Sequence, residues 1–463
     1  MIAGPLFLIM LPLIVAPLVF VLRRWAPLTA LLASATALVM ASLCLGLPLD
    51  RPISVLGWQV ALGQPMRVLG REFALGLAAS LAMSFVWLMA ALAFLFAWRI
   101  SQGSLFFALG LVILSLLSAA VMIRHFLFAV LFLWVASLIG VFIVQGEQQG
   151  LRRGALRYLV VVSLAVPPLL TAPWLVELHA VNPDNLALLR HAAVLLAIGF
   201  AILLAMVPFH GWVSALAADA PPVVMAFVLT VTNAVVLLLM LNLLQSYSWL
   251  SQDPQVYSFL RLGGLLTAAV GGLLAFAQRD FGRLLGYAVL SDMGCTMVAL
   301  GVASPAALTA ALLQVAHRSV GLMLAAMGLA VVRHHADSDA FDSLSGVARH
   351  LPLSMAGLVL GGLSLAGMPL TAGFPSRWAI YRLLSAPGLG LALLLCGAGV
   401  ALAYLRGLST LLDPSTEPQV KPEPRIASLM ILGMIVLCLV LGLHPQWLLP
   451  SVQRVVESFS FLR

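Results

Sequence analysis

Long runs of apolar residues, separated by short polar stretches, follow one another along almost the whole chain. A helix needs about 20 mostly apolar residues to cross a bilayer, and by that rule the sequence predicts about fourteen spanning segments. They are 2–22, 25–48, 73–98, 104–123, 126–145, 155–176, 187–209, 220–246, 257–277, 283–303, 305–332, 352–384, 387–411 and 426–448. The longest stretches between them are 49–72, 177–186, 333–351 and 412–425. None of these is long enough to form a soluble domain.

Prolines interrupt two of the predicted helices. Proline removes a backbone hydrogen bond and clashes with the preceding turn. Pro208 follows one apolar run, and Pro369 and Pro375 lie inside the predicted segment 352–384. A continuous helix over that segment would be about 50 Å long, well beyond a hydrocarbon core of about 30 Å. We therefore predict one broken helix near Pro208 and a second near Pro369–Pro375.

The two interruptions resemble each other in sequence. Leu-Ala-Met-Val-Pro-Phe at 204–209 parallels Leu-Ala-Gly-Met-Pro-Leu at 365–370. Paired broken helices in the two halves of a membrane protein indicate an inverted-repeat transporter. Irregular backbone at membrane depth is tolerated only against protein or a water-filled cavity, so both interruptions mark candidate functional regions.

The composition fits a membrane protein, with 63% hydrophobic and only 9% charged residues. Soluble domains carry about 25% charge, so a soluble enzyme, a disordered chain and a disulfide scaffold are excluded. The 24 basic residues outnumber the 16 acidic ones. Most are arginines that stand singly between apolar runs, which is typical of membrane orientation and not of nucleic-acid binding. Their distribution predicts a multi-pass protein of a prokaryotic-type inner membrane, surrounded by lipid, with both termini on the non-cytoplasmic side.

Motifs for cofactor chemistry are missing from the sequence. It contains no nucleotide, flavin, haem or iron–sulfur motif, and its four cysteines have neither metal nor disulfide spacing. We therefore predict no catalytic site, no cofactor and no metal in this chain. The polar cluster at 333–342 is interpreted as a solvated loop, with metal binding by His334, His335 and Asp337 as the alternative.

Four stretches of the sequence resemble the antiporter-like subunit family. They are VPFHGWVSALAADAPPVV (207–224), QRDFGRLLGYAVLSDMG (278–294), FDSLSGVARHLPLS (341–354) and LSLAGMPLTAGFPSRW (363–378). That family comprises proton-conducting membrane subunits of respiratory complex I, of membrane-bound hydrogenases and of Mrp-type antiporters. It also includes the membrane subunit of DAB-type inorganic-carbon uptake complexes.

The resemblance implies an all-α polytopic fold with two inverted five-helix repeats, each containing a broken helix. It divides the chain into four parts. These are an N-terminal three-helix segment (1–103), a first repeat (104–246), a second repeat (257–411) and a C-terminal loop with the last helix (412–463). It also implies proton movement along polar groups at the bilayer midplane, and assembly with other membrane or peripheral subunits.

The chain departs from the family pattern in its first repeat. Family members carry a glutamate on the fifth span, where this chain has Trp134 or Val135. A lysine belongs on the seventh span, where Leu203 stands, and Val228 lies near the usual histidine of the eighth. The first repeat therefore lacks the acid–base pairs that make a proton half-channel in its relatives.

The second repeat keeps ionisable residues at membrane depth. Asp292, His317 and Arg318 are candidate proton-relay groups, with Asp292 pairing with Arg318 or His317. For His317, the alternative is a structural histidine that is held by a hydrogen bond. Arg377 stands where the family has a lysine; because a guanidinium scarcely deprotonates, we expect it to be a fixed positive charge. The alternative for the acid and the arginines is a structural ion pair. His210, at the mouth of the first broken helix, is expected to bond freed backbone, with proton entry as the alternative.

These observations predict a membrane subunit of a multisubunit complex that translocates protons or monovalent cations. Its redox reaction, if any, belongs to partner subunits, as in a redox-driven pump. One alternative is the proton-coupled membrane subunit of a two-component inorganic-carbon uptake system. The other is a scaffold that anchors a partner and conducts nothing, an alternative favoured by the missing first-repeat charges.

Overall fold

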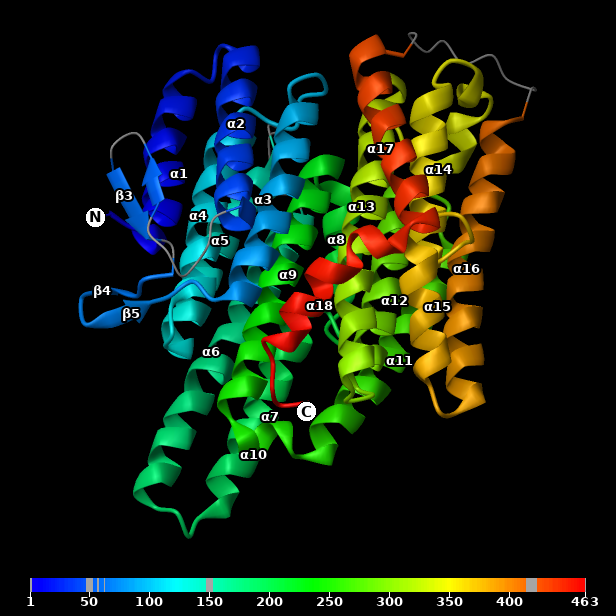
Figure 1. Ribbon diagram of the computed structural model, residues 1–463. Coiled ribbons are helices and arrows are strands. Elements are labelled where there is room, and N and C mark those ends of the chain that lie inside the picture. Colours follow the sequence, from blue (N-terminus) through cyan, green and yellow to red (C-terminus); the bar gives the residue numbers. More distant parts are fainter. Residues whose placement is uncertain are drawn as a thin grey trace.

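The computed structural model describes residues 2–46, 53–55, 58–61, 63–146, 153–413 and 423–462. In these residues the chain forms a bundle of long, roughly parallel and antiparallel helices (Figure 1). The helices before the first interruption are α1 (Gly4–Val21), α2 (Ala26–Gly46), α3 (Leu77–Ala97), α4 (Phe106–Met122), α5 (Phe126–Gln145), α6 (Arg153–Val181) and α7 (Leu186–Leu203). The central ones are α8 (Gly211–Asp219), α9 (Pro222–Ser246), α10 (Ser248–Ser251), α11 (Pro254–Ala277), α12 (Phe281–Leu300) and α13 (Pro305–Ala336). The last are α14 (Pro352–Ala366), α15 (Gly373–Leu383), α16 (Pro387–Leu411), α17 (Arg425–Leu443) and α18 (Leu449–Glu457).

Short strands and 3-10 turns occupy the connections. β3 (Trp58–Ala61) pairs with β1 (Ile2–Ala3) in parallel and with β2 (Ile53–Val55) in antiparallel register, while β4 (Met66–Val68) and β5 (Arg71–Phe73) form a hairpin. The 3-10 turns are Phe341–Leu344, Val347–Arg349 and Pro445–Trp447. These elements are short, and the described chain is nearly all helical, as the predicted all-α fold requires.

The helices agree with the predicted membrane crossings. Twelve helices of the described chain are long and apolar enough to cross a bilayer, and α4 and α14 are shorter apolar helices. Together they correspond to the fourteen predicted segments. Two of the fourteen continue into a second half-helix, α7 into α8 and α14 into α15. The predicted polytopic membrane fold is confirmed.

Both interruptions leave the helical conformation over about seven residues. In the first, which separates Leu203 from Gly211, Ala205 has a φ of 53°. In the second, Gly367 has a φ of 77°, a conformation that suits glycine at a helix C-terminus. Pro208 and Pro369 lie inside the interruptions. Pro375, predicted to break the helix, instead lies in the first turn of α15, where its missing N–H costs no helical hydrogen bond.

The helix α13 and its neighbours form the centre of the bundle. The apolar window of α13 is 100% buried inside the chain, and that of α9 is 94% buried. Glycines let α11 approach α12 closely, because a Cβ on Gly294 would lie 2.3 Å from the backbone nitrogen of Ala268. The bundle thus holds α13, with its buried Gln314, His317 and Arg318, at its centre.

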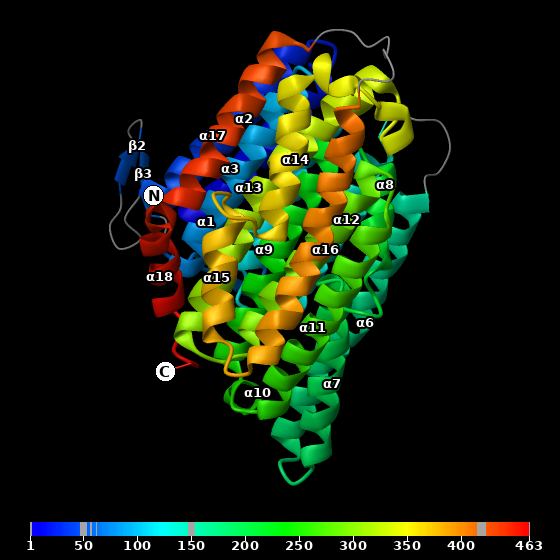
Figure 2. The same cartoon turned by 90° about the vertical axis from the view of Figure 1, so that its right-hand side faces the viewer.

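Two peripheral features were not predicted. The helix α6 continues to Val181, so that α6 and α7 extend beyond the other helices as a hairpin (Figures 1 and 2). The segment 177–186 is therefore largely helical and not a loop. At the other end of the chain, α18 crosses α3 and α13, and the Gln245 side chain bonds the backbone N–H of Ser460 at 2.9 Å.

Candidate functional site

The candidate site surrounds Asp292, in the middle of α12. The aspartate is fully buried, with 0% of its side chain exposed. The helix begins at Asp280, whose carboxylate accepts a hydrogen bond from the Arg283 backbone N–H at 2.8 Å and so caps the first turn. From that cap, α12 carries Asp292 between α13 and α15, the two helices that bring opposite charges to it.

Two guanidinium groups hold the Asp292 carboxylate. Arg318 Nη1, on α13, lies 3.3 Å from Asp292 Oδ2, and Arg377 Nη2, on α15, lies 3.5 Å from Oδ1. Arg318 Nη1 also donates to Thr296 Oγ1 at 3.2 Å. All three charged side chains are at least 96% buried, with 0%, 4% and 3% of their side chains exposed. Among the described residues, they are the only buried charged side chains.

A polar chain extends from Asp292 to His317. Gln314 Nε2 donates to Asp292 Oδ1, and Ser376 Oγ donates to Gln314 Oε1 at 2.6 Å. The Ser376 oxygen lies 3.0 Å from His317 Nδ1. A serine hydroxyl has one proton, and here that proton is directed to Gln314. The His317 Nδ1 must therefore be the donor to Ser376, which fixes the histidine tautomer.

Two buried nitrogen atoms of this cluster have no partner. They are Nε2 of His317 and Nε of Arg377. With Nδ1 as the donor, Nε2 of the neutral His317 ring is a free proton acceptor. The cluster also holds two guanidiniums against one carboxylate, so it carries one positive charge in excess. The groups of this cluster that can change their protonation state are His317 and Asp292, while the arginines remain charged.

The broken helices satisfy their freed backbone groups with side chains. Ser364 Oγ accepts from the Gly373 N–H at 3.0 Å, and Arg377 Nη1 donates to the Ala366 carbonyl at 2.5 Å. In the first interruption, Thr267 Oγ1 accepts from the Val207 N–H at 3.1 Å. Arg377 therefore links the end of α14 directly to the Asp292 carboxylate.

Arg333, near the C-terminus of α13, holds α8, the half-helix that follows the first interruption. Arg333 donates to the backbone carbonyls of Ala217, Ala218 and Ala220, at the C-terminus of α8, at 3.2, 3.1 and 3.0 Å. It also bonds Asp339 through Nε at 3.0 Å. A cation at a helix C-terminus satisfies free carbonyls and complements the helix dipole. One helix thus carries part of the charged cluster and the anchor of α8.

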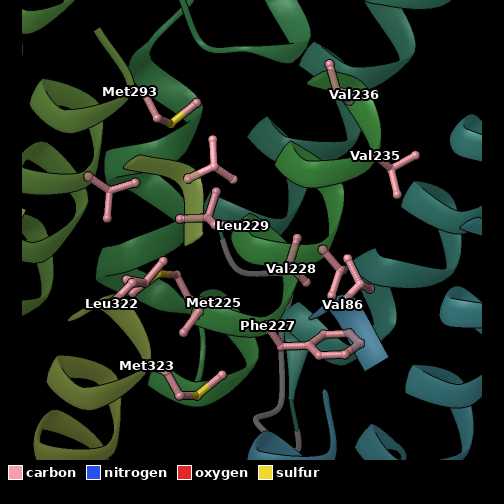
Figure 3. Close-up of a cluster of buried hydrophobic side chains, with 14 of the residues drawn as sticks. Val86, Met225, Phe227, Val228, Leu229, Val235, Val236, Met293, Leu322 and Met323 are labelled. Carbon is pink, nitrogen blue, oxygen red and sulfur yellow. The ribbon is translucent and has the colours of Figure 1, made fainter. Parts of the chain in front are cut away.

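The segment 104–246 has no comparable site. Leu203 and Val228 are buried, and Figure 3 shows Val228 beside Val86, Phe227 and Leu229. Trp134 Nε1 donates to Ser163 Oγ at 3.2 Å. No buried charged side chain lies in this segment, within the residues that the structure describes.

The structure brings together Asp292, His317, Arg318 and Arg377, four of the five predicted proton-path residues. The ion pair with Arg318 is present, whereas His317 contacts Ser376 instead of Asp292. His210 lies apart, before α8, and its buried Nδ1 has no hydrogen-bond partner.

Sequence reasoning missed three polar members of the cluster, Gln314, Ser376 and Thr296. Gln314 could have been found, because its spacing of three and four from His317 and Arg318 places all three on one helix face. Thr296 follows Asp292 by one turn, which is the same signal. Ser376 gives no signal, since its partners are about 60 residues away in the sequence.

Comparison with known proteins shows similarity in sequence and in fold. Residues 174–402 match the NADH:quinone oxidoreductase/Mrp antiporter transmembrane family. NADH-quinone oxidoreductase subunit N of Chromohalobacter salexigens is 32% identical over 277 residues, covering 57% of each chain. Formate hydrogenlyase subunit 3 of Escherichia coli K12 is 27% identical over 290 residues, 56% of this chain and 47% of that protein. The chain thus spans about half the length of the curated relatives it matches.

Solved structures agree on the fold. A chain of the archaeal membrane-bound sulfane sulfur reductase superposes with a TM-score of 0.84 at 18% identity, covering 98% of this chain and 97% of that one. A chain of respiratory complex I from Thermus thermophilus gives 0.77 at 20% identity, covering 99% of both. The family match over residues 174–402 and the shared fold together confirm the resemblance to the antiporter-like subunit family.

Proposed function

We propose that the chain is the membrane subunit of a multisubunit complex and translocates protons through the segment 257–411. The observation that carries this proposal is the buried Asp292 carboxylate held between two guanidiniums, with an unpartnered His317 nitrogen at the other end of its polar chain. Ionisable groups at membrane depth are costly and mark ion pathways. The groups that gain and lose protons are Asp292 and His317, whereas Arg318 and Arg377 remain positively charged.

The hydrogen bonds from Asp292 through Gln314 and Ser376 to His317 position the two titratable groups but do not themselves carry protons. Gln314 joins Ser376 to Asp292 through its amide. An amide has no proton to give up near neutral pH, so His317 and Asp292 exchange protons with water separately. Gln314 instead couples the two groups, because a change of charge at one end alters the hydrogen bonds at the other.

Proton flux in vesicles tests this proposal. The intact complex is reconstituted with a pH-sensitive dye inside, and flux is followed under an imposed pH gradient. We expect Asp292→Asn and His317→Gln to lower the flux at least tenfold, and Arg318→Leu to do the same. The control Asp342→Asn, an exposed acid outside the cluster, should leave it unchanged. Normal flux in folded Asp292→Asn and Arg318→Leu variants would refute the assignment.

A second candidate function is a non-conducting scaffold, favoured by the apolar side chains at Leu203, Val228 and Trp134. Proton-conducting relatives would have charged groups there, as the family pattern implies. A scaffold predicts no proton flux above that of empty vesicles in the intact complex, while assembly with partner subunits persists. The same reconstitution therefore separates the two functions.

We further propose that the chain works with other subunits in a bacterial inner membrane. Its relatives are named as subunits, of NADH-quinone oxidoreductase and of formate hydrogenlyase. Gentle solubilisation of the native membrane, followed by pull-down of the tagged chain, should recover stoichiometric partners. Recovery of the chain alone would contradict this part of the proposal.

A further inference from the structure

A groove between α7, α9, α10 and α11 has polar groups at one end and hydrocarbon along its length. Its volume is about 520 Å³. Arg190, Trp249 and Asp253 lie where α7, α10 and α11 meet, at the end of the bundle from which the α6–α7 hairpin extends (Figures 1 and 2). The deep end reaches Leu204 and Met206, in the first interruption.

The polar end has unused hydrogen-bonding capacity. The Trp249 Nε1 atom is buried and has no acceptor. The Arg190 guanidinium has no hydrogen bond or ion pair with any described residue. Both groups are donors and one is a cation, so they fit an anionic oxygen such as a phosphate. Basic pockets between spanning helices and aromatic residues near their ends are where lipid headgroups bind.

Asp253, on the same rim, limits which lipid headgroup fits the groove. Asp253 Oδ1 accepts the Gln255 backbone N–H at 2.9 Å as the cap of α11, and its charge is otherwise unpaired in the described chain. A carboxylate there repels a purely anionic headgroup and attracts an amine. An arginine and an aspartate on one rim therefore match a zwitterion with a phosphate and a primary ammonium.

The rest of the groove suits an acyl chain. Its walls include Leu196 and Phe200 of α7 and Leu260 of α11, and a water molecule there would lack polar partners. The groove faces lipid, because Val194 and Phe259 on its sides are 52% and 40% exposed. We propose that it binds one phosphatidylethanolamine, with the phosphate on Arg190 and Trp249, the amine on Asp253, and a tail reaching the first interruption.

Native mass spectrometry of the full-length chain in its purified complex tests this site. After mild delipidation, the complex is titrated with dioleoyl phosphatidylethanolamine, phosphatidylglycerol or phosphatidylcholine. We expect one retained phosphatidylethanolamine and at least tenfold weaker retention in Arg190→Gln, since charge-assisted hydrogen bonds to the phosphate are lost. Arg157→Gln, an exposed arginine of α6 outside the groove, is the matched control and should retain the lipid.

Two further variants test the binding of the headgroup and the binding of the acyl tail separately. Asp253→Asn still caps α11 but should abolish the preference for phosphatidylethanolamine over phosphatidylglycerol. Ala197→Phe narrows the groove and should prevent binding, whereas Leu391→Phe, on the lipid-exposed face of α16, should not. Equal retention in Arg190→Gln, or equal binding of phosphatidylglycerol by the unmodified chain, would overturn the proposal. Cross-linking of Val194→Cys to a partner subunit instead of lipid would also overturn it.

Discussion

At the scale of single residues, the Asp292 carboxylate decides the stability of the cluster. Arg318 and Arg377 lie 3.3 and 3.5 Å from its oxygens, and all three groups are buried. Removing one partner of a buried ion pair leaves a charge without compensation, which costs more than the pair contributes. The cluster therefore tolerates the loss of an arginine better than the loss of its single acid.

A double-mutant cycle tests this asymmetry. We expect Asp292→Leu to lower the free energy of unfolding by about 3–5 kcal/mol, because two guanidiniums remain buried and unpaired. Adding Arg318→Leu should recover part of that loss, since only Arg377 then lacks an anion. Thermal and denaturant unfolding in detergent measure both effects. A double variant less stable than Asp292→Leu alone would contradict the argument.

Ser376 gives a second prediction at this scale. Ser376→Ala removes the donor to Gln314 and the acceptor for His317, so we expect a loss of about 1–3 kcal/mol. Ser319→Ala is the matched control, because its buried hydroxyl bonds only the Val315 carbonyl of its own helix. Unfolding experiments should show a clearly smaller effect for the control; equal effects would mean that the Ser376 link is dispensable.

At the scale of elements, α13 joins the charged cluster to the first broken helix. Gln314, His317 and Arg318 lie in its middle, and Arg333, near its end, bonds the last carbonyls of α8. A shift of α13 along its axis would therefore be transmitted to α8. The segment 104–246, which has no buried charged side chain in its described residues, is thus connected to the cluster through the contact between Arg333 and α8.

Hydrogen–deuterium exchange checks the anchor of α8. In Arg333→Gln, three carbonyl contacts and the ion pair with Asp339 are weakened. We expect amides of Gly211–Asp219 to exchange at least tenfold faster, since local opening of α8 becomes easier. Arg349→Gln, an exposed arginine in the following connection, should leave that exchange unchanged. Unaltered exchange in Arg333→Gln would show that packing alone holds α8.

Helix packing beside Asp292 makes a further prediction. In Gly294→Ala, the new methyl group would lie 2.3–2.8 Å from α11 backbone atoms, which cannot rotate away. We expect a loss of about 1–3 kcal/mol from overpacking and reduced proton flux, because α12 shifts. Gly433→Ala, in open space on α17, should be neutral or slightly stabilising. Similar unfolding temperatures for the two variants would argue against a tight α11–α12 contact.

At the scale of the whole molecule, the C-terminal segment contacts helices that are far apart in the sequence. The C-terminal segment, 449–462, crosses α3 and α13 and is bonded by Gln245 at the end of α9. Gln245→Ala removes three hydrogen bonds and should speed exchange of the Ser460 and Phe461 amides at least tenfold. Gln252→Ala is the exposed control. Unchanged exchange would mean that α18 alone secures this end.

Most of the architecture was predictable, whereas most of the site's connections were not. Hydropathy and proline positions predict the fourteen crossings and both interruptions, because a bilayer demands continuous apolar helices. The charged members of the cluster stand out for the same reason. Ser376 and Arg333 do not, since their partners lie far away in sequence and only packing brings them together. The groove at Arg190 likewise depends on how α7, α10 and α11 meet.

The charge balance around Asp292 has one more consequence. The centre starts with a single uncompensated positive charge, and a proton added to His317 or Asp292 raises it to two. In a medium of low polarity, that second charge strongly disfavours a third. On the proposed proton path, occupancy by one proton therefore disfavours a second, so that protons would pass this centre one at a time.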